Sequence, residues 1–313
     1  SANPHSNGFG TLEQRVNERF KDNFVQFDAA ANLELGKLLP KAAALSIPFF
    51  ASISNTISSP QWDPFDMDIT LKQKINQAPK SQRDSIRNNA IDFASIKTIS
   101  FTNVHKNRTG NKKPQLWDIE NLDLSYTYTK TEAHNPLIEY NNVTKQRGGL
   151  GYNFAPAPKF IEPFKKMFRK SKTHWFDLVK DFNFNPVPSQ LTFKADIYRQ
   201  FGVIKPRSIG GDKYFTPETF DKYFTFDRNY ILRWDLTRSL NLDYSALNNA
   251  RIDEPYGRLD TKAKRDTVKQ NFFSGGRNTV FSQAINLSYN VPLSKLPLTD
   301  WTTLRLRYTA NYQ

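Results

Sequence analysis

The 313-residue sequence contains no cysteine, and that absence excludes several kinds of site. Disulfide scaffolds, cysteine–zinc centres and thiol nucleophiles all require cysteine side chains. A chain without free thiols fits an exported protein. The sequence opens on Ser1-Ala2-Asn3-Pro4, which does not have the form of a signal peptide, and stops inside an alternating run that ends at Tyr312. We therefore expect an internal piece of a longer chain.

Long hydrophobic runs are also missing. No stretch approaches 18 consecutive apolar residues, hydrophobic residues make up 38% of the chain, and the mean hydropathy is −0.64. These values exclude a transmembrane helix, which needs about 20 apolar residues in succession. They do not exclude a membrane-spanning β-barrel, because alternation of apolar and polar residues halves the apparent hydrophobicity of its strands.

Catalytic and cofactor-binding motifs are absent as well. The sequence contains no nucleophile elbow, P-loop or dinucleotide-binding fingerprint. Acidic pairs such as Asp253-Glu254 and Asp66/Asp68 stand in turn-like contexts. No metal-ligand spacing relates the four histidines, which are His5, His105, His134 and His174. We expect no enzymatic activity, no cofactor and no bound metal.

The chain is strongly basic, with 44 lysines and arginines against 30 acidic residues, a net charge of +14. Such a balance is typical of nucleic-acid-binding proteins. Here the charges are scattered through loops and polar strand faces instead of forming a stripe, and no known nucleic-acid-binding motif occurs. We therefore expect no nucleic-acid partner.

The most informative feature is a long alternation between Phe224 and Ala246, in which nearly every even-numbered residue is apolar and nearly every odd-numbered residue is polar. A period of two predicts one extended strand with an apolar and a polar face. At about 23 residues it would extend roughly 75 Å, far beyond the five or six residues of ordinary strands. Such strands are typical of barrels with lipid outside and water inside.

We predict that the apolar face of this run contacts lipid and that the polar face lines a lumen. Arg228 and Arg238 interrupt the apolar face, ten residues apart. We expect both guanidinium groups at membrane interfaces, with Tyr230–Leu236 or Leu240–Ala246 as the lipid band. The alternative is a strand bend in a soluble sandwich, with Arg238 at the corner. The predicted lipid-facing residues are Tyr230, Leu232, Trp234, Leu236, Leu240, Leu242 and Tyr244, and the predicted lumen-facing residues are Arg233, Asp235, Thr237, Ser239, Asn241 and Asp243.

Shorter alternating runs predict further strands, roughly eight to ten in all. They lie near residues 25–35, 45–53, 99–101, 122–128, 150–154, 191–197, 281–291 and 302–312. Pro48 within its run suggests an edge or a bulge. A short helix is expected after Thr11, and residues 79–89 are expected to form a solvated loop or an exposed helix. Residues 155–190 are expected to form a helical or loop insertion, because Phe160, Phe164, Met167 and Phe168 recur at helical spacing among basic residues.

The predicted fold class is therefore all-β. The chain, residues 1–313, is expected to form one partial wall of a very large antiparallel transmembrane β-barrel with long loops and a few short helices.

The C-terminal third contains several specific motifs. They are Tyr223–Arg228, Leu232–Thr237, Asn248–Pro255, Gly257–Lys262, Gly275–Thr279 and Leu287–Pro292. With these motifs the segment Phe201–Gln313 resembles the SprA/Sov family, the outer-membrane translocons of the type IX secretion system, which are also tied to gliding motility. In the N-terminal half, Leu38–Lys41 and Trp62–Asp66 are compatible with the same family.

The resemblance implies a very large single-chain barrel that passes folded cargo proteins across the outer membrane of a Gram-negative bacterium. It also implies a plug protein and a lateral gate beside a PorV-like barrel. The present chain would form part of the wall and would leave two unpaired sheet edges. The motif Asn249–Asp260 is expected at a strand end, where it would order the rim.

Two other functions share the same periodicity. A passive porin or nutrient transporter would show every alternation described above. A soluble β-rich surface-binding protein would use its aromatic residues as a core, and it would fold without detergent.

Overall fold

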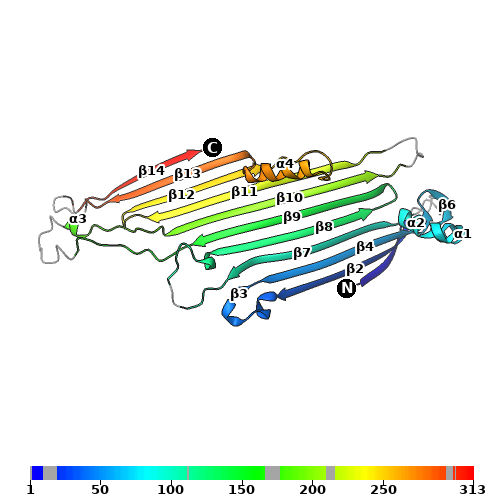
Figure 1. The fold of residues 1–313 in the computed structure, drawn as a ribbon, viewed down its shortest axis with the longest axis horizontal. Helices are drawn as coiled ribbons and strands as arrows, with labels where there is room; N and C mark the ends of the chain where they lie inside the picture. Colours follow the sequence, from blue (N-terminus) through cyan, green and yellow to red (C-terminus); the bar gives the residue numbers. More distant parts are fainter. Residues whose placement is uncertain are drawn as a thin grey trace.

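The computed structural model describes residues 2–9, 20–110, 113–165, 177–208, 216–293, 299 and 301–313. Its dominant feature is one antiparallel sheet in which each long strand pairs with the next long strand in the chain (Figure 1). The strands in sheet order are β1 (Ala2–Phe9), β2 (Phe20–Glu34), β4 (Pro48–Pro60), β7 (Asp92–Lys106), β8 (Leu122–His134), β9 (Ile138–Phe154), β10 (Gln190–Pro206), β11 (Thr219–Asp235), β12 (Leu240–Arg251), β13 (Arg277–Val291) and β14 (Leu304–Tyr312).

Short elements fill the connections. The strand β3 (Leu45–Ser46) pairs with β7, and β5 (Trp62–Asp63) pairs with β6 (Asp66–Thr70). The helices are α1 (Leu71–Gln77), α2 (Lys80–Ala90), α3 (Asp177–Lys180), α4 (Lys262–Phe273), and the 3-10 turns η2 (Leu35–Leu38), η3 (Lys41–Ala43) and η4 (Ile119–Asn121). In the described part of the chain, none of the helices has the length and apolar character needed to cross a membrane.

The connections lie at two ends of the sheet. One end, here called the α2 end, carries residues 61–91, 135–137, 207–208, 216–218 and 252–276. The other, here called the α3 end, carries residues 35–47, 107–110, 113–121, 155–165, 177–189, 236–239, 292–293 and 301–303. Local signals explain the first helices: Thr70 and Gln73 form a capping box at the start of α1. Residues 80–90 form α2, so the polar segment is the exposed helix that the sequence allowed.

The prediction of a single long strand from Phe224 to Ala246 is wrong. β11 ends at Asp235 and β12 begins at Leu240, so the run is a hairpin. The register explains why the alternation continues across the turn. Trp234 pairs with Leu242 and Asp235 pairs with Asn241, so even-numbered residues face even-numbered residues. Directly paired residues of antiparallel strands share a face, and a turn of this length therefore preserves the parity of the pattern.

Smaller expectations can also be compared with the structure. Pro48 is the first residue of β4, opposite Glu34 of β2, in a strand that has neighbours on both sides. The run predicted near residues 150–154 is the end of a longer strand, β9, which begins at Ile138. In the segment 155–190, for which the sequence predicts a helical or loop insertion, residues 155–165 are irregular and α3 is a short helix followed by a loop. The helix expected after Thr11 and the basic residues around Met167 lie outside the described residues.

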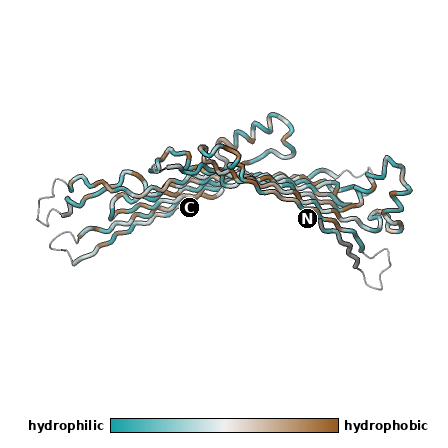
Figure 2. The backbone as a smooth tube through the Cα atoms, turned by 90° about the horizontal axis from the view of Figure 1, so that it is seen from below, coloured by the Kyte–Doolittle hydropathy of each residue, from teal (hydrophilic) through white to brown (hydrophobic). Residues whose placement is uncertain are grey.

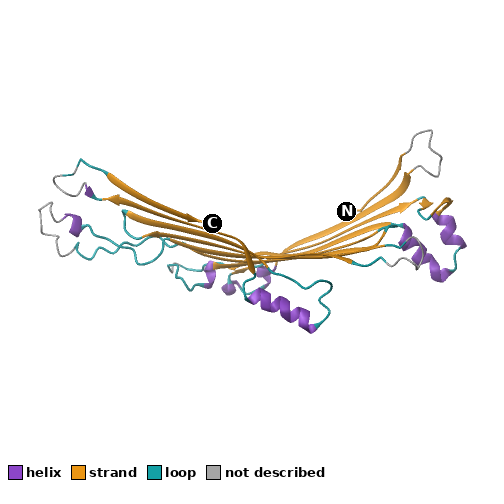
Figure 3. Cartoon of the chain, turned by 90° about the horizontal axis from the view of Figure 1, so that it is seen from above, coloured by secondary structure: helices purple, strands orange, loops and turns teal. Residues whose placement is uncertain are grey.

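The sheet is bent into an arch (Figures 2 and 3). α4 lies on its convex side (Figure 3). The all-β, antiparallel fold class is confirmed. Within the described residues the sheet does not close on itself, because β1 and β14 form its two edges. The chain exposes 21565 Å², whereas a compact protein of this mass exposes about 13,400 Å². An open sheet accounts for the excess.

Candidate functional site

The convex face of the sheet is mostly apolar, apart from charged side chains such as the ion-paired group Lys97, Lys130 and Glu132. Phe272 of α4 packs against Phe224 and Phe226, with ring centroids 6.1 and 5.6 Å apart, so the even-numbered residues of β11 face the convex side. The strand registers extend this assignment across the sheet. The residues here called the apolar belt are Val25, Phe27, Leu33, Phe49, Ile53, Ile99, Phe101, Leu122, Leu124, Tyr126, Leu150, Tyr152, Leu191, Phe193, Ile197, Tyr230, Leu232, Trp234, Leu240, Leu242, Tyr244, Ile285, Leu287, Tyr289, Leu304, Leu306 and Tyr308.

Much of the belt is uncovered. Leu33, Leu124 and Leu306, on three strands far apart in the sheet, are 54, 53 and 52% exposed. A folded soluble monomer rarely presents a continuous apolar surface of this extent. The belt therefore requires an apolar environment outside this chain.

The concave face is mostly polar, with a few apolar side chains such as Ile96, Ile231 and Leu247 among its residues. Cross-strand hydrogen bonds join hydroxyl and amide side chains along it, such as Ser100–Thr127 at 2.7 Å and Thr192–Asn153 at 3.0 Å. Charged residues of both signs lie among them. The polar residues of this face include Ser52, Ser54, Thr56, Ser58, Thr98, Ser100, Ser125, Thr127, Thr129, Arg147, Lys194, Asp196, Asn229, Arg233, Asn241, Asp243 and Ser245. Such a surface suits contact with water.

The register groups the residues predicted from the long alternation onto the two faces. Six predicted lipid-facing residues, Tyr230, Leu232, Trp234, Leu240, Leu242 and Tyr244, lie on the convex face, and Leu236 lies in the β11–β12 turn. Four predicted lumen-facing residues, Arg233, Asp235, Asn241 and Asp243, lie on the concave face, whereas Thr237 and Ser239 lie in the turn.

The two predicted interface arginines have different surroundings. Arg228 lies on the convex face within β11, donates to Asn248 at 3.2 Å and to the Gly275 carbonyl at 3.3 Å, and stacks on Phe226. Arg238 lies in the β11–β12 turn at the α3 end, where it pairs with Glu162 at 2.7 Å. Arg238 is therefore at a corner between two strands and does not interrupt one strand.

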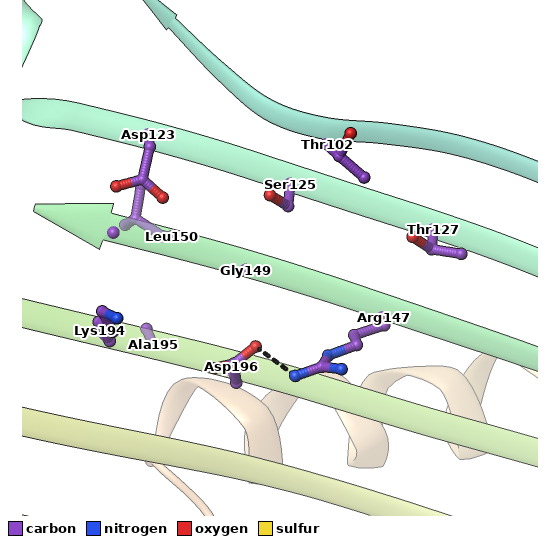
Figure 4. Close-up of a pocket in the computed structure, with 11 residues that line it drawn as sticks. Thr102, Asp123, Ser125, Thr127, Arg147, Gly149, Leu150, Lys194, Ala195 and Asp196 are labelled. Carbon is purple, nitrogen blue, oxygen red and sulfur yellow. Dashed lines mark hydrogen bonds and ion pairs between the residues drawn. The ribbon is translucent and has the colours of Figure 1, made fainter. Parts of the chain in front are cut away.

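A shallow furrow of about 340 Å³ crosses the concave face over β8, β9 and β10 (Figure 4). Gly149 and Gly151 of β9 form its floor, and they have no side chains to fill the space between the neighbouring strands. The carboxylate of Asp123 occupies the space that a Cβ at Gly151 would need. Arg147 pairs with Asp196 at 3.3 Å across the furrow. The floor is thus smooth, and its walls carry both charge signs.

The motif Asn249–Asp260 lies where β12 ends, as expected from the sequence, and it folds back over the convex face. Its anchor is Glu254, whose side chain is 2% exposed and accepts a 2.5 Å hydrogen bond from Arg199 of β10. Lys222 of β11 lies 3.7 Å from the same carboxylate and donates to the Pro255 carbonyl at 2.7 Å. The loop is therefore held to two strands of the sheet by a buried ionic cluster.

A second contact holds the outer part of this loop. Arg258 donates to both carboxylate oxygens of Glu218, each at 3.1 Å, and the Tyr140 hydroxyl donates to the same group. These hydrogen bonds, first from Arg258 and then from Tyr140, lower the pKa of Glu218 below its usual value of 4.5. Bidentate, charge-assisted hydrogen bonds of this kind hold the two side chains in a fixed relative orientation.

The lowered pKa of Glu218 predicts how the loop responds to acid. A carboxylate with a depressed folded-state pKa stabilises the folded state fully above its unfolded-state pKa, and the contribution is lost as the pH falls through the folded-state value. We expect amide protection of residues 255–260, corrected for intrinsic exchange, to be constant from pH 7 to 5 and to fall below about pH 4.5. In Glu218→Gln this acid-dependent step should be missing. A wild-type step centred near neutral pH would contradict the assignment.

Sequence reasoning missed both the ionic cluster and the furrow. In the sequence Glu254 is one of an acidic pair in a turn-like context, and nothing local indicates its partners Arg199 and Lys222, which are distant in sequence. The furrow had a local signal: Gly148, Gly149 and Gly151 interrupt an alternating run, and glycine inside a strand often marks a close approach or missing side-chain volume.

The features described so far are surfaces and one anchored loop. In the described ranges no cluster of three histidine or carboxylate side chains could hold a metal ion. The features that remain are an exposed apolar face, a hydrated face of mixed charge and an anchored loop at one end.

Comparison with known families gives one finding. Residues 1–75, which include β1, β2, β4 and the β5–β6 hairpin, match the SprA N-terminal family, described as a motility related/secretion protein. No curated protein matches the chain. The match agrees with the resemblance seen in Phe201–Gln313, which lies at the other end of the sequence. Residues 1–75 are therefore similar to the N-terminal region of the SprA family of motility- and secretion-related proteins.

Proposed function

We propose that this chain forms part of the wall of a protein-conducting channel in the outer membrane, as a component of the type IX secretion system that also supports gliding motility. The observation that carries the proposal is the two-faced arch. Its convex face exposes an apolar belt across ten strands and its concave face is mostly polar, the distribution expected where the outside of a wall meets lipid and the inside meets water.

The width of the arch supports a large lumen. Eleven long strands follow one another in the sheet without closing it. A barrel of about eight strands closes into an interior just wide enough for side chains. Further strands would continue the sheet at β1 and β14, because unpaired backbone groups are not tolerated in lipid.

The partners of this channel are part of the proposal. Outer-membrane lipid would cover the belt, and secreted cargo proteins would pass along the concave face. The furrow over β9 has a floor without side chains and walls with charges of both signs, so no large side chain stands in the path of a passing chain. A plug protein and a PorV-like barrel are proposed from the family resemblance alone. The wall itself performs no chemistry in this proposal.

Depletion of the protein in its native cells tests this function. We expect selective loss of secreted and surface proteins that bear the type IX C-terminal signal, with these proteins retained in the periplasm. The secreted and surface proteomes are compared by mass spectrometry before and after depletion, with re-expression of the protein as the control. Unchanged secretion with altered uptake of small solutes would overturn the proposal in favour of a porin. Recovery of the protein in the soluble fraction without detergent would favour a surface-binding protein.

A further inference from the structure

A groove of about 830 Å³ lies on the convex face between α4 and strands β9 to β11. Strand lengths explain its position. β12 ends at Arg251 opposite Thr225, whereas β11 begins at Thr219, so β10 and β11 extend past their neighbour towards the α2 end. The β12–β13 connection, including α4, folds over this uncovered part of the sheet. The gap beneath it is the groove.

The interior of the groove is apolar. Ile197, Phe201 and Phe224 come from the sheet, and Leu259, Val268 and Phe272 come from the loop and α4. Ile197 also continues the row of Leu191 and Phe193 on the convex side of β10, so the groove joins the apolar belt without a polar break.

The rim of the groove carries more basic than acidic side chains. Its one carboxylate among the lining residues, Asp260, is paired with Lys264 at 3.0 Å. Arg199 and Arg258 are neutralised by Glu254 and Glu218. Arg265 and Lys269 also line the groove, and they stand one helical turn apart on α4. In the described part of the chain neither of these two makes an ion pair, so the rim carries two uncompensated positive charges beside an apolar interior.

We propose that this groove binds a membrane lipid with a phosphate headgroup, whose acyl chain enters the apolar interior and whose phosphate contacts Arg265 and Lys269. The inference rests on the proposed function, because the lipid reaches the groove from the bilayer around the belt. The two positive charges favour an anionic headgroup. Anionic lipid headgroups commonly contact basic residues at the boundary of an apolar surface.

The test compares two lipids that share their acyl chains. The protein is purified from its native membrane in mild detergent and titrated with palmitoyl-oleoyl phosphatidylglycerol or with the phosphatidylcholine of the same tails. Bound lipid is counted by native mass spectrometry. The variant is Arg265→Gln/Lys269→Gln. The matched control, Lys80→Gln/Lys262→Gln, also removes two exposed charges but lies outside the groove. Inorganic phosphate is added as a competitor.

We expect the wild type and the control to retain one phosphatidylglycerol in preference to phosphatidylcholine. Two basic residues near an anionic group correspond to about 30-fold in affinity, and the groove variant should lose about that much. The proposal would be overturned if the wild type retained both lipids equally. It would also be overturned if the groove variant and the control lost the same amount of bound phosphatidylglycerol, or if inorganic phosphate displaced the bound lipid. The titration is made in detergent and does not depend on secretion. A failure of the lipid proposal would therefore appear in this titration, whereas a failure of the channel function would appear in the proteome comparison.

Discussion

Replacing Leu242 by arginine is expected to prevent stable insertion of the protein into the outer membrane, whereas replacing its neighbour Asn241 by arginine is expected to be tolerated. Leu242 lies in the apolar belt, paired with Trp234 of β11 and Leu287 of β13. In the proposed wall it faces lipid, where an arginine near the bilayer midplane costs about 2–4 kcal/mol. That is a large part of the stability of an ordinary folded domain, about 5–15 kcal/mol.

Asn241 is the matched control because it has the same strand, depth and substituted residue but the opposite face. It pairs with Asp235 and Ser288 on the concave side, so an arginine there would project into water. The measurement is the amount of each variant in purified outer membranes, by immunoblot, together with the urea concentration at which the inserted protein unfolds. If Leu242→Arg accumulated and resisted urea as well as Asn241→Arg, the convex face would not be in lipid.

The two-faced sheet could be predicted from the sequence because it depends on a strictly local pattern. Alternation assigns each residue to a face whatever its strand pairs with. Alternation does not show where a strand turns back if even-numbered residues stay on the same face after the turn. For this reason β11 and β12 look like one strand in the sequence. The signal for the break was Thr237, whose hydroxyl accepts from the backbone amides of Ser239 and Leu240 in the turn. Threonine and serine are typical of such turns.

What could not be predicted depends on contacts between distant segments. Residues 2–9 have no alternating pattern and become β1 by pairing with β2. Glu254 reads as one acidic residue in a polar loop, and only the sheet places Arg199 and Lys222 against it. The groove arises from unequal strand lengths. The residues that line it carry no sequence signal for this difference in length.

Replacing Glu254 by glutamine is expected to release the β12–β13 connection from the convex face. The substitution keeps the size of the side chain and removes the charge that neutralises Arg199 and Lys222, which are 26 and 12% exposed. Removing one partner of a buried ion pair costs about 3–5 kcal/mol, because the remaining charge stays desolvated without compensation. We expect the free energy that holds the connection on the sheet to fall by about 3 kcal/mol, near the lower end of this range, because Arg199 retains partial access to water.

Hydrogen exchange measures this effect where it should occur. Amide protection should fall across residues 252–273 in Glu254→Gln and stay unchanged in β8 and β9. Asp253→Asn is the control, since Asp253 is the adjacent carboxylate but is 53% exposed and pairs with Arg277 at 3.2 Å on the surface. An exposed pair contributes at most about 1 kcal/mol, so protection should change little in this variant. Equal protection in both variants would show that the cluster does not hold the connection.

The same substitution also separates the roles of the cluster and the groove. Arg199 lines the groove and is held by Glu254. If the β12–β13 connection detached, the groove would lose α4, which covers it, together with the basic residues of its rim. Glu254→Gln should therefore lose lipid of both headgroup types, whereas Arg265→Gln/Lys269→Gln should lose only the preference for the anionic one. Loss of preference in both variants with total binding unchanged would mean that the cluster acts on charge alone and that the roof stays in place without it.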